Sequence, residues 1–186
     1  GLRTLTVIQN AVLLARRKQP ELNINQIDYN DQKVLDYIGT GKTDGVFQLE
    51  SAGMKGFMKE LKPHNLEDVI AGISLYRPGP MDFIPQYIRG KNDSSSITYD
   101  CPQLEPILAP TYGCIVYQEQ VMQIVRDLAG YSLGRSDLLR RAMSKKKAAV
   151  MEKERKIFIY GDEETGVPGC IKNGIDEQTA NKIYDE

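Results

Sequence analysis

Apolar residues recur every three to four positions along most of the chain, the spacing that places them on one face of an α-helix. Residues 2–19 form the first such stretch, and Pro20 ends it because proline cannot continue a helix. Residues that can cap a helix N-terminus precede the next three stretches; they are Asp31, Ser51 and Asn65. Further helices are predicted over 81–89, 118–129, 136–143 and 148–160 and in the last residues before 186, with Ser136 as the cap of the helix over 136–143.

Polar, proline-rich and glycine-rich segments separate these helices. "RPGP" at 77–80 predicts a rigid bend in which Pro80 favours an extended Gly79. "GKNDSSS" at 90–96 is the best candidate for an internal linker, and "GVFQLES" and "CIVY" predict short strands. The sequence therefore predicts a mainly α fold, a multi-helix domain of short helices with a few very short strands. We divide it into two helical parts, 1–90 and 91–186.

"GTGKT" at 39–43 resembles the end of a Walker A loop, G-x-x-x-x-G-K-[ST], which wraps nucleotide phosphates. The first glycine of that pattern would stand at position 36, where this chain has Asp36, and a carboxylate repels phosphate. The preceding residues also predict a helix instead of the buried strand that the motif needs. We therefore interpret Gly39 and Gly41 as the end of a helix and a turn.

The composition is that of a soluble globular protein, with 41% apolar and 26% charged residues in 186 positions. Three cysteines without a C-x-x-C pair predict no disulfide framework and a reducing, cytoplasmic location. The single histidine, His64, and the cysteines lack the close spacing of zinc ligands. No apolar run has transmembrane length. The chain begins without methionine and ends inside a helical pattern, so we expect it to be a piece of a longer protein.

Positive charge is concentrated in one part of the chain. Residues 134–160 hold nine Lys or Arg and three acids, a net charge of +6 in a chain whose total is −1. The densest stretch is "LLRRAMSKKK" at 138–147, where Leu138, Leu139, Ala142 and Met143 are predicted to face inward. Arginine can grip phosphate oxygens with two donors while lysine adds a point charge. This cluster therefore suits a nucleoside triphosphate or a nucleic-acid backbone, although solvated charge at a helix end gives the same pattern.

Other candidate chemistry is sparse. Arg77 stands at the "RPGP" corner, where a structural turn is the alternative interpretation. Glu119 in "YQEQ" is favoured by the helix dipole and has no second acid nearby. Ser132 and Ser136 have no neighbouring histidine for a nucleophilic triad. The residues predict a cationic binding surface, and we assign neither a catalytic residue nor a metal ligand.

Five motifs in order resemble the alpha subunit of bacterial DNA polymerase III, the family C replicative polymerases. They are "GLRTLT" at 1–6, "VFQLESAGMK" at 46–55, "LYRPGP" at 75–80, "PTYGCIVYQEQVMQI" at 110–124 and "LLRRAMSKKK" at 138–147. They extend over nearly the whole chain, and a general helical pattern does not produce them. The resemblance implies the first part of the fingers domain, which binds the incoming dNTP and packs over the nascent base pair.

The resemblance also implies roles for individual residues. Arg140, Arg141, Lys145, Lys146 and Lys147 match the nucleotide-facing basic motif, and Arg77 and Gln118 match supporting positions. Two-metal nucleotidyl transfer in the family depends on palm aspartates that would lie outside this chain. Mg²⁺ is therefore expected in the parent enzyme and no cofactor in this chain, which is expected to be inactive alone. The implied partners are primer–template DNA, dNTP and other replicase subunits such as the sliding clamp, without a membrane.

Two alternatives remain open at this stage. The chain could be a stand-alone helical nucleic-acid-binding module, which would lack an upstream palm with an Asp-x-Asp pair. It could also be a protein-interaction module in which the lysine run serves solubility alone. Salt distinguishes the nucleic-acid functions from the second alternative, because phosphate contacts release counterions and weaken as salt rises.

Overall fold

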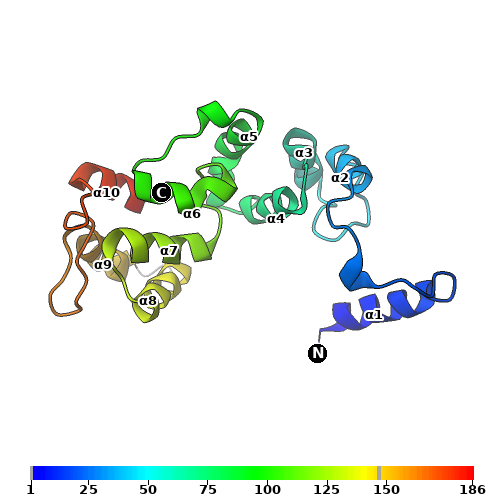
Figure 1. Cartoon of the computed structure of the whole chain (residues 1–186), viewed down its shortest axis with the longest axis horizontal. Helices are drawn as coiled ribbons and strands as arrows, with labels where there is room; N and C mark the ends of the chain where they lie inside the picture. The colour runs from blue at the N-terminus through cyan, green and yellow to red at the C-terminus, as the bar shows by residue number, and fades with distance from the viewer. Residues whose placement is uncertain (1, 146–147) are drawn as a thin grey trace.

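The computed structural model describes residues 2–145 and 148–186, and these residues contain ten α-helices (Figure 1). Their bounds are α1 (Arg3–Ala15), α2 (Gln32–Gly39), α3 (Ala52–Leu61), α4 (Leu66–Leu75), α5 (Ile84–Asn92), α6 (Glu105–Leu108), α7 (Gln118–Ala129), α8 (Leu133–Ser144), α9 (Ala148–Tyr160) and α10 (Glu177–Asp185). Short 3-10 segments connect several of them: η1 (Ile24–Gln26), η2 (Pro80–Phe83), η3 (Ser94–Ser96), η4 (Pro102–Leu104) and η5 (Ala109–Thr111). The predicted mainly α fold is confirmed.

The two predicted strands are wrong. "GVFQLES" and "CIVY" are turns and irregular backbone, and the β pairing in the described part of the chain is a single bridge between Asp162 and Val167. Within residues 2–145 and 148–186, no neighbouring strand is available to pair with either stretch. Each contributes a buried side chain to a helical core instead, Leu49 from the first and Cys114 from the second.

Three of the four predicted N-caps are confirmed. The Asp31 carboxylate accepts the amide of Lys33 at 2.9 Å, and the Ser51 hydroxyl accepts that of Met54 at 3.2 Å. The Asn65 side chain accepts the amide of Asp68 at 2.8 Å. Each bond satisfies an N–H that the first turn of a helix leaves without a partner.

Two clusters of buried side chains hold the helices together. The N-terminal core joins α3, α4 and α5 to the segments around Leu49 and Cys114. Met58, Leu61 and Leu75 are completely buried there, and truncating one such leucine to alanine typically costs about 2–5 kcal/mol. The C-terminal core lies among α6, α7, α8, α9 and α10, with Leu128 and Phe158 deeply buried. The division into parts 1–90 and 91–186 stays a prediction.

A buried polar contact, which we call the α4–α5 clamp, connects the helices on either side of "RPGP". Asp68 of α4 accepts the His64 amide at 2.8 Å and the Tyr87 hydroxyl at 3.2 Å. Lys91 of α5 lies 3.8 Å from the same carboxylate, and both charged side chains are 2% exposed. The Lys91 ammonium also donates to the Lys62 carbonyl at 3.0 Å. The clamp therefore fixes the corner that carries Arg77.

The segments around this corner differ from the prediction. Gly79 is not extended but has φ +100°, a conformation that side chains other than glycine's rarely adopt. Helix α5 continues to Asn92, through the first residues of the predicted linker, because Gly90 and the Lys91 side chain are buried against the N-terminal core.

The "GTGKT" stretch is a helix end and a turn, as predicted. Gly39 is the last residue of α2, and Gly41 has φ +68°. A Cβ atom at Gly41 would lie 2.7 Å from the Lys55 carbonyl oxygen, so the turn packs against α3 at glycine distance. The element before this turn is a helix, α2, whereas a P-loop follows a β-strand.

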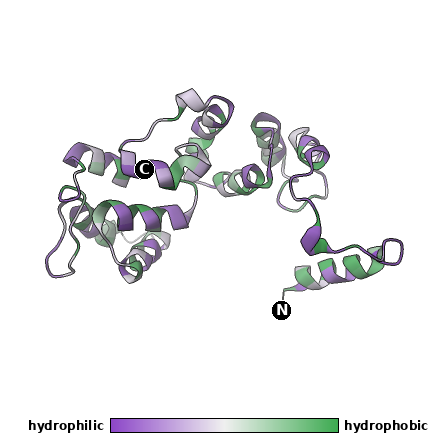
Figure 2. Ribbon diagram, viewed as in Figure 1, coloured by the Kyte–Doolittle hydropathy of each residue, from purple (hydrophilic) through white to green (hydrophobic). Residues whose placement is uncertain are grey.

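Helix α1 lies apart from the rest of the chain in Figure 1, and Figure 2 shows that it is mostly apolar. None of its residues is buried against the described part of the chain, and Leu5, Val7, Leu13 and Leu14 are more than half exposed. None of the described helices combines the length and the apolar character that crossing a bilayer requires.

Candidate functional site

Helix α8 carries the arginines of the basic cluster and begins earlier than predicted. Its N-cap is Ser132, whose hydroxyl accepts the Arg135 amide at 3.2 Å. Ser136 is not the cap, because it is buried inside the helix and donates to the Leu133 carbonyl at 2.7 Å. The earlier start places Asp137 in the second turn, one helical turn before the arginines.

The inward face of α8 is narrower than predicted. Leu139 and Ala142 are buried as expected, but Leu138 is 64% exposed and Met143 is 42% exposed. Ser136, Leu139 and Ala142 follow one another at three-residue spacing, so a single narrow stripe of α8 is buried, and its Leu139 belongs to the C-terminal core. The other sides of the helix carry the charges.

Asp137 binds both arginines of the cluster. Its Oδ1 accepts Arg140 Nε at 3.0 Å and Nη2 at 2.7 Å, and its Oδ2 lies 2.8 Å from Arg141 Nε. The Arg140 side chain is 33% exposed and that of Arg141 is 64% exposed. Hydrogen bonding from Arg140, followed by the nearby charge of Arg141, holds the pKa of the Asp137 carboxyl below its ordinary value.

Arg140 also reaches the start of α7. Its Nη1 lies 3.5 Å from Gln118 Oε1, at the outer limit of a hydrogen bond. Gln118 is the first residue of α7, whose N-terminus follows the extended backbone of Tyr117. Two helices separated in sequence by a tight turn therefore bring these side chains together.

Gln118 and Arg77 line the same cleft of 470 Å³. The other lining residues come from the end of α4, the "RPGP" corner and the start of α7: Ser74, Pro78, Pro80, Val116, Tyr117 and Glu119. We call this the Arg77 cleft. Three predicted site residues, Arg77, Gln118 and Arg140, thus lie at or beside one cleft, together with one carboxylate, Glu119.

Two other predicted site residues that the structure describes, Arg141 and Lys145, do not line the Arg77 cleft. Arg141 lies on the outer side of α8, and Lys145 is the exposed C-cap residue of that helix. Lys146 and Lys147 lie outside the described residues. The described structure therefore separates the predicted cluster into a cleft-side arginine, Arg140, and an outward-facing pair, Arg141 and Lys145.

The sequence interpretation counted Arg135 among the nine Lys or Arg of the cationic surface and missed its pairing with an acid. Arg135 Nη2 donates to Glu154 Oε1 at 2.8 Å, and the Tyr131 hydroxyl donates to Glu154 Oε2 at 2.8 Å. The guanidinium lies over the Tyr131 ring, 5.2 Å from its centroid. Burial, with Glu154 adding to it, raises the pKa of Tyr131. These contacts connect α8 to α9.

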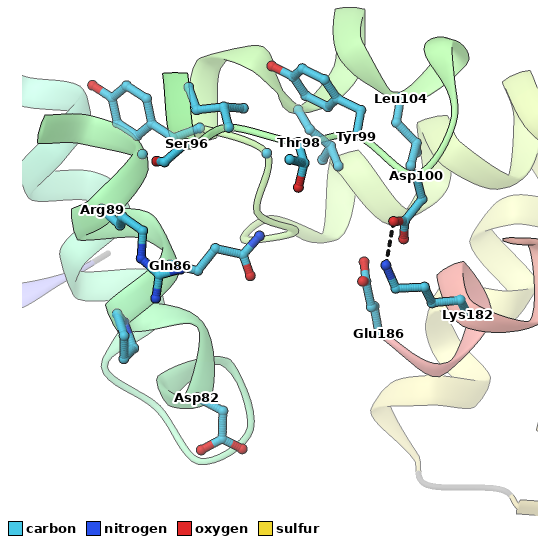
Figure 3. A pocket seen from close by; sticks show the side chains of 16 residues that line it. Asp82, Gln86, Arg89, Ser96, Thr98, Tyr99, Asp100, Leu104, Lys182 and Glu186 are labelled. Carbon is cyan, nitrogen blue, oxygen red and sulfur yellow. Dashed lines mark hydrogen bonds and ion pairs between the residues drawn. The ribbon is translucent and has the colours of Figure 1, made fainter. Parts of the chain in front are cut away.

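A second cleft, of 480 Å³, lies between α5 and α10 (Figure 3). Its walls carry both signs of charge, with Arg89 and Asp82 on one side and the Lys182–Asp100 ion pair across from them. Burial raises the pKa of Glu186 at its edge. None of the predicted site residues that the structure describes lines this cleft, and mixed charge does not favour an anionic ligand.

The described residues contain no group of three or more His, Cys, Asp or Glu side chains arranged to hold a metal ion. The three cysteines are buried and unpaired with one another as disulfides, and none lies in the Arg77 cleft. The chemistry that this arrangement offers is the binding of an anion by guanidinium and amide groups.

The comparisons with known proteins agree with the motifs. Residues 4–166 match the family described as the bacterial DNA polymerase III alpha subunit finger domain. DNA polymerase III subunit alpha of Halalkalibacterium halodurans is 48% identical over 186 residues, and those of Staphylococcus epidermidis and Staphylococcus aureus are 46% identical over 189 and 187 residues. All of this chain is covered in each case, but only 16–17% of each relative. The chain belongs to the finger-domain family of the bacterial DNA polymerase III alpha subunit.

Proposed function

We propose that the Arg77 cleft and Arg140 bind the triphosphate of an incoming dNTP during template-directed DNA synthesis by the parent polymerase. The observation that supports this most directly is the position of Arg140, which reaches from α8 to Gln118 at the cleft that Arg77 lines. A guanidinium offers several N–H donors in a fixed plane, a geometry that matches phosphate oxygens. Two arginines, Arg77 from the "RPGP" corner and Arg140 from α8, can therefore contact one polyphosphate.

The part played by these residues is electrostatic. Phosphoryl transfer moves charge onto the leaving phosphates, and fixed cations stabilise that charge without reorganising. Arg140 and Arg77 would bind and orient the triphosphate, and Gln118 would hold the guanidinium in place. Mg²⁺ belongs in this proposal to the parent enzyme, where palm aspartates outside this chain would bind it and it would assist nucleotidyl transfer. We accordingly expect the chain alone not to polymerise DNA.

The outward-facing pair supports a second contact of the same enzyme. Arg141 and Lys145 lie four residues apart, and therefore on one side of α8, where exposed cations suit the phosphodiester backbone of primer–template DNA. Contacts to other replicase subunits such as the sliding clamp belong to the rest of the parent protein.

The test is single-nucleotide incorporation by the full-length parent across a dNTP titration. Arg140→Ala and Arg77→Ala are each expected to lower kcat/KM at least about tenfold, equivalent to 1.4 kcal/mol of transition-state stabilisation. Arg89→Ala is the matched control, because Arg89 is an exposed arginine of the other cleft and should leave kcat/KM unchanged. Normal incorporation by Arg140→Ala and Arg77→Ala would refute the assignment of the cleft to dNTP.

A further inference from the structure

Asp137 is an anion at the centre of a surface that we assign to an anionic ligand, and the proposed function does not use it. Its carboxylate lies three residues before Arg140 and four before Arg141, the two spacings at which side chains meet along a helix. Oδ1 serves Arg140 and Oδ2 serves Arg141, so the two oxygens are divided between two neighbouring guanidiniums.

The carboxylate binds particular donors of each arginine. Arg140 donates from Nε and Nη2 to the carboxylate, and its Nη1 is directed to Gln118 at the Arg77 cleft. Arg141 contacts the carboxylate through Nε, at the root of the guanidinium, and most of its side chain is exposed. Asp137 thus holds Arg140 through Nε and Nη2 and Arg141 through Nε, while Arg140 Nη1 is left to contact Gln118 and the Arg141 side chain is 64% exposed.

Holding an arginine in this way changes what a ligand must do. A free arginine side chain has many rotamers, and fixing them on binding opposes affinity. The two arginines, adjacent in sequence and followed by Lys145, also repel one another unless an anion lies between them. A carboxylate that holds both guanidiniums by one edge restricts their rotamers before the ligand binds. It also offsets part of the repulsion between the two arginines.

We propose that Asp137 is a positioning residue, which orients Arg140 and Arg141 for phosphate before nucleotide binds. The inference rests on the proposed function of Arg140. If Asp137 served only to neutralise the cluster, its negative charge would oppose phosphate, and removing it would tighten dNTP binding. A positioning role predicts that removing the Asp137 charge weakens the use of dNTP, whereas a neutralising role predicts that it tightens dNTP binding.

The measurement is kcat and KM for dNTP in the full-length parent, with Asp137→Asn and Asp137→Glu compared to wild type. Asparagine keeps the size and shape of the aspartate side chain but is neutral. Glutamate keeps the negative charge on a side chain that is one methylene longer. We expect Asp137→Asn to lower kcat/KM for dNTP at least about fivefold, to leave the KM for primer–template unchanged, and to be partly rescued by Asp137→Glu. An unchanged or lower KM for dNTP in Asp137→Asn, without loss of kcat, would overturn the proposal.

A double-mutant cycle with Arg140→Ala separates this inference from the proposed function. If Asp137 acts through Arg140, Asp137→Asn should have less effect in the Arg140→Ala background than in wild type. An equal effect in both backgrounds would overturn the positioning role while Arg140 kept its function. If Arg140→Ala itself incorporates normally, the proposed function fails first. Thermal unfolding of each variant should stay near wild type, since Asp137 and both arginines are partly exposed and such helix pairs contribute little to stability.

Discussion

Replacing Asp68 by alanine should destabilise the chain strongly, because the α4–α5 clamp would lose the partner of a buried cation. The Lys91 and Asp68 side chains are each 2% exposed, so the ammonium would stay out of water without its carboxylate. The His64 amide and the Tyr87 hydroxyl would lose their acceptor as well. Removing one partner of a buried pair costs about 3–5 kcal/mol, and we expect a value in this range.

The reverse replacement, Lys91→Met, should cost less. Asp68 would keep the donors of His64 and Tyr87, whereas Lys91 without Asp68 would keep only the Lys62 carbonyl and the His64 ring nitrogen, 3.0 and 3.3 Å away. The free energy of unfolding should therefore fall further in Asp68→Ala than in Lys91→Met. Glu67→Ala is the matched control, because Glu67 is the exposed neighbour in the same turn and its loss costs under about 1 kcal/mol.

The penalty should also depend on pH. Burial lowers the pKa of Lys91 below its ordinary value of 10.5, and the charge of Asp68 partly offsets that shift. At pH values between the folded and the unfolded pKa of Lys91, this amine binds more protons in the unfolded chain than in the folded chain. The free energy of unfolding therefore rises with pH in this range. Without Asp68 the folded pKa of Lys91 falls further, and the cost of the mutation should shrink by up to about 1.4 kcal/mol per pH unit as pH rises toward the folded pKa of Lys91 in wild type.

Urea denaturation of the 186-residue chain, followed by circular dichroism at pH 7 and at pH 9, measures both effects. The reasoning would be refuted by a loss under about 1 kcal/mol in Asp68→Ala at pH 7, the range of an ordinary surface substitution. A loss that grows with pH would show that Lys91 is not the group left without its partner.

Two further predictions concern close packing and burial. Gly53→Ala should destabilise the chain by about 1–3 kcal/mol in the same urea assay, because its Cβ would lie 1.6 Å from the Tyr76 hydroxyl. Gly56→Ala in the same helix has no atom within 4 Å of the new Cβ and should stabilise by about 0.5–1 kcal/mol, so equal effects at both glycines would contradict the packing argument. Burial raises the pKa of Cys114 to about 11 and that of Cys170 to about 12, so both thiols should react slowly with Ellman's reagent at pH 8 until urea unfolds the chain. Fast reaction of the folded chain would show that the thiols are accessible.

The sequence was sufficient for the elements whose signals are local. Asp31, Ser51 and Asn65 cap the predicted helices because a cap needs only a side-chain oxygen and the next turn. The cap of α8 was assigned to Ser136 instead of Ser132, since both serines satisfy the same local rule. Tertiary packing decides between them, because burying Ser136 and Leu139 together requires the earlier start.

The site was predictable in its residue types but not in its geometry. Helical spacing shows that Asp137 can reach either arginine, but not that it holds both while Arg140 turns toward Gln118. The approach of α7 to α8 fixes that direction, and nothing local encodes it. The predicted strands were wrong for a related reason, since an apolar stretch becomes a strand only where a neighbouring strand can pair with it. Whether the seven predicted residues bind nucleotide stays a prediction.

Helix α1 has a consequence for how this chain folds. It has 13 residues and buries none of them against the described part of the chain, so the cores contribute nothing to keeping it helical. A helix of that length is only marginally populated in water on local propensity alone. Any surface that covered Leu5, Val7, Leu13 and Leu14 would therefore stabilise α1 as a helix. The amide-exchange rates of α1 would then report contact with that surface, independently of the stability of either core.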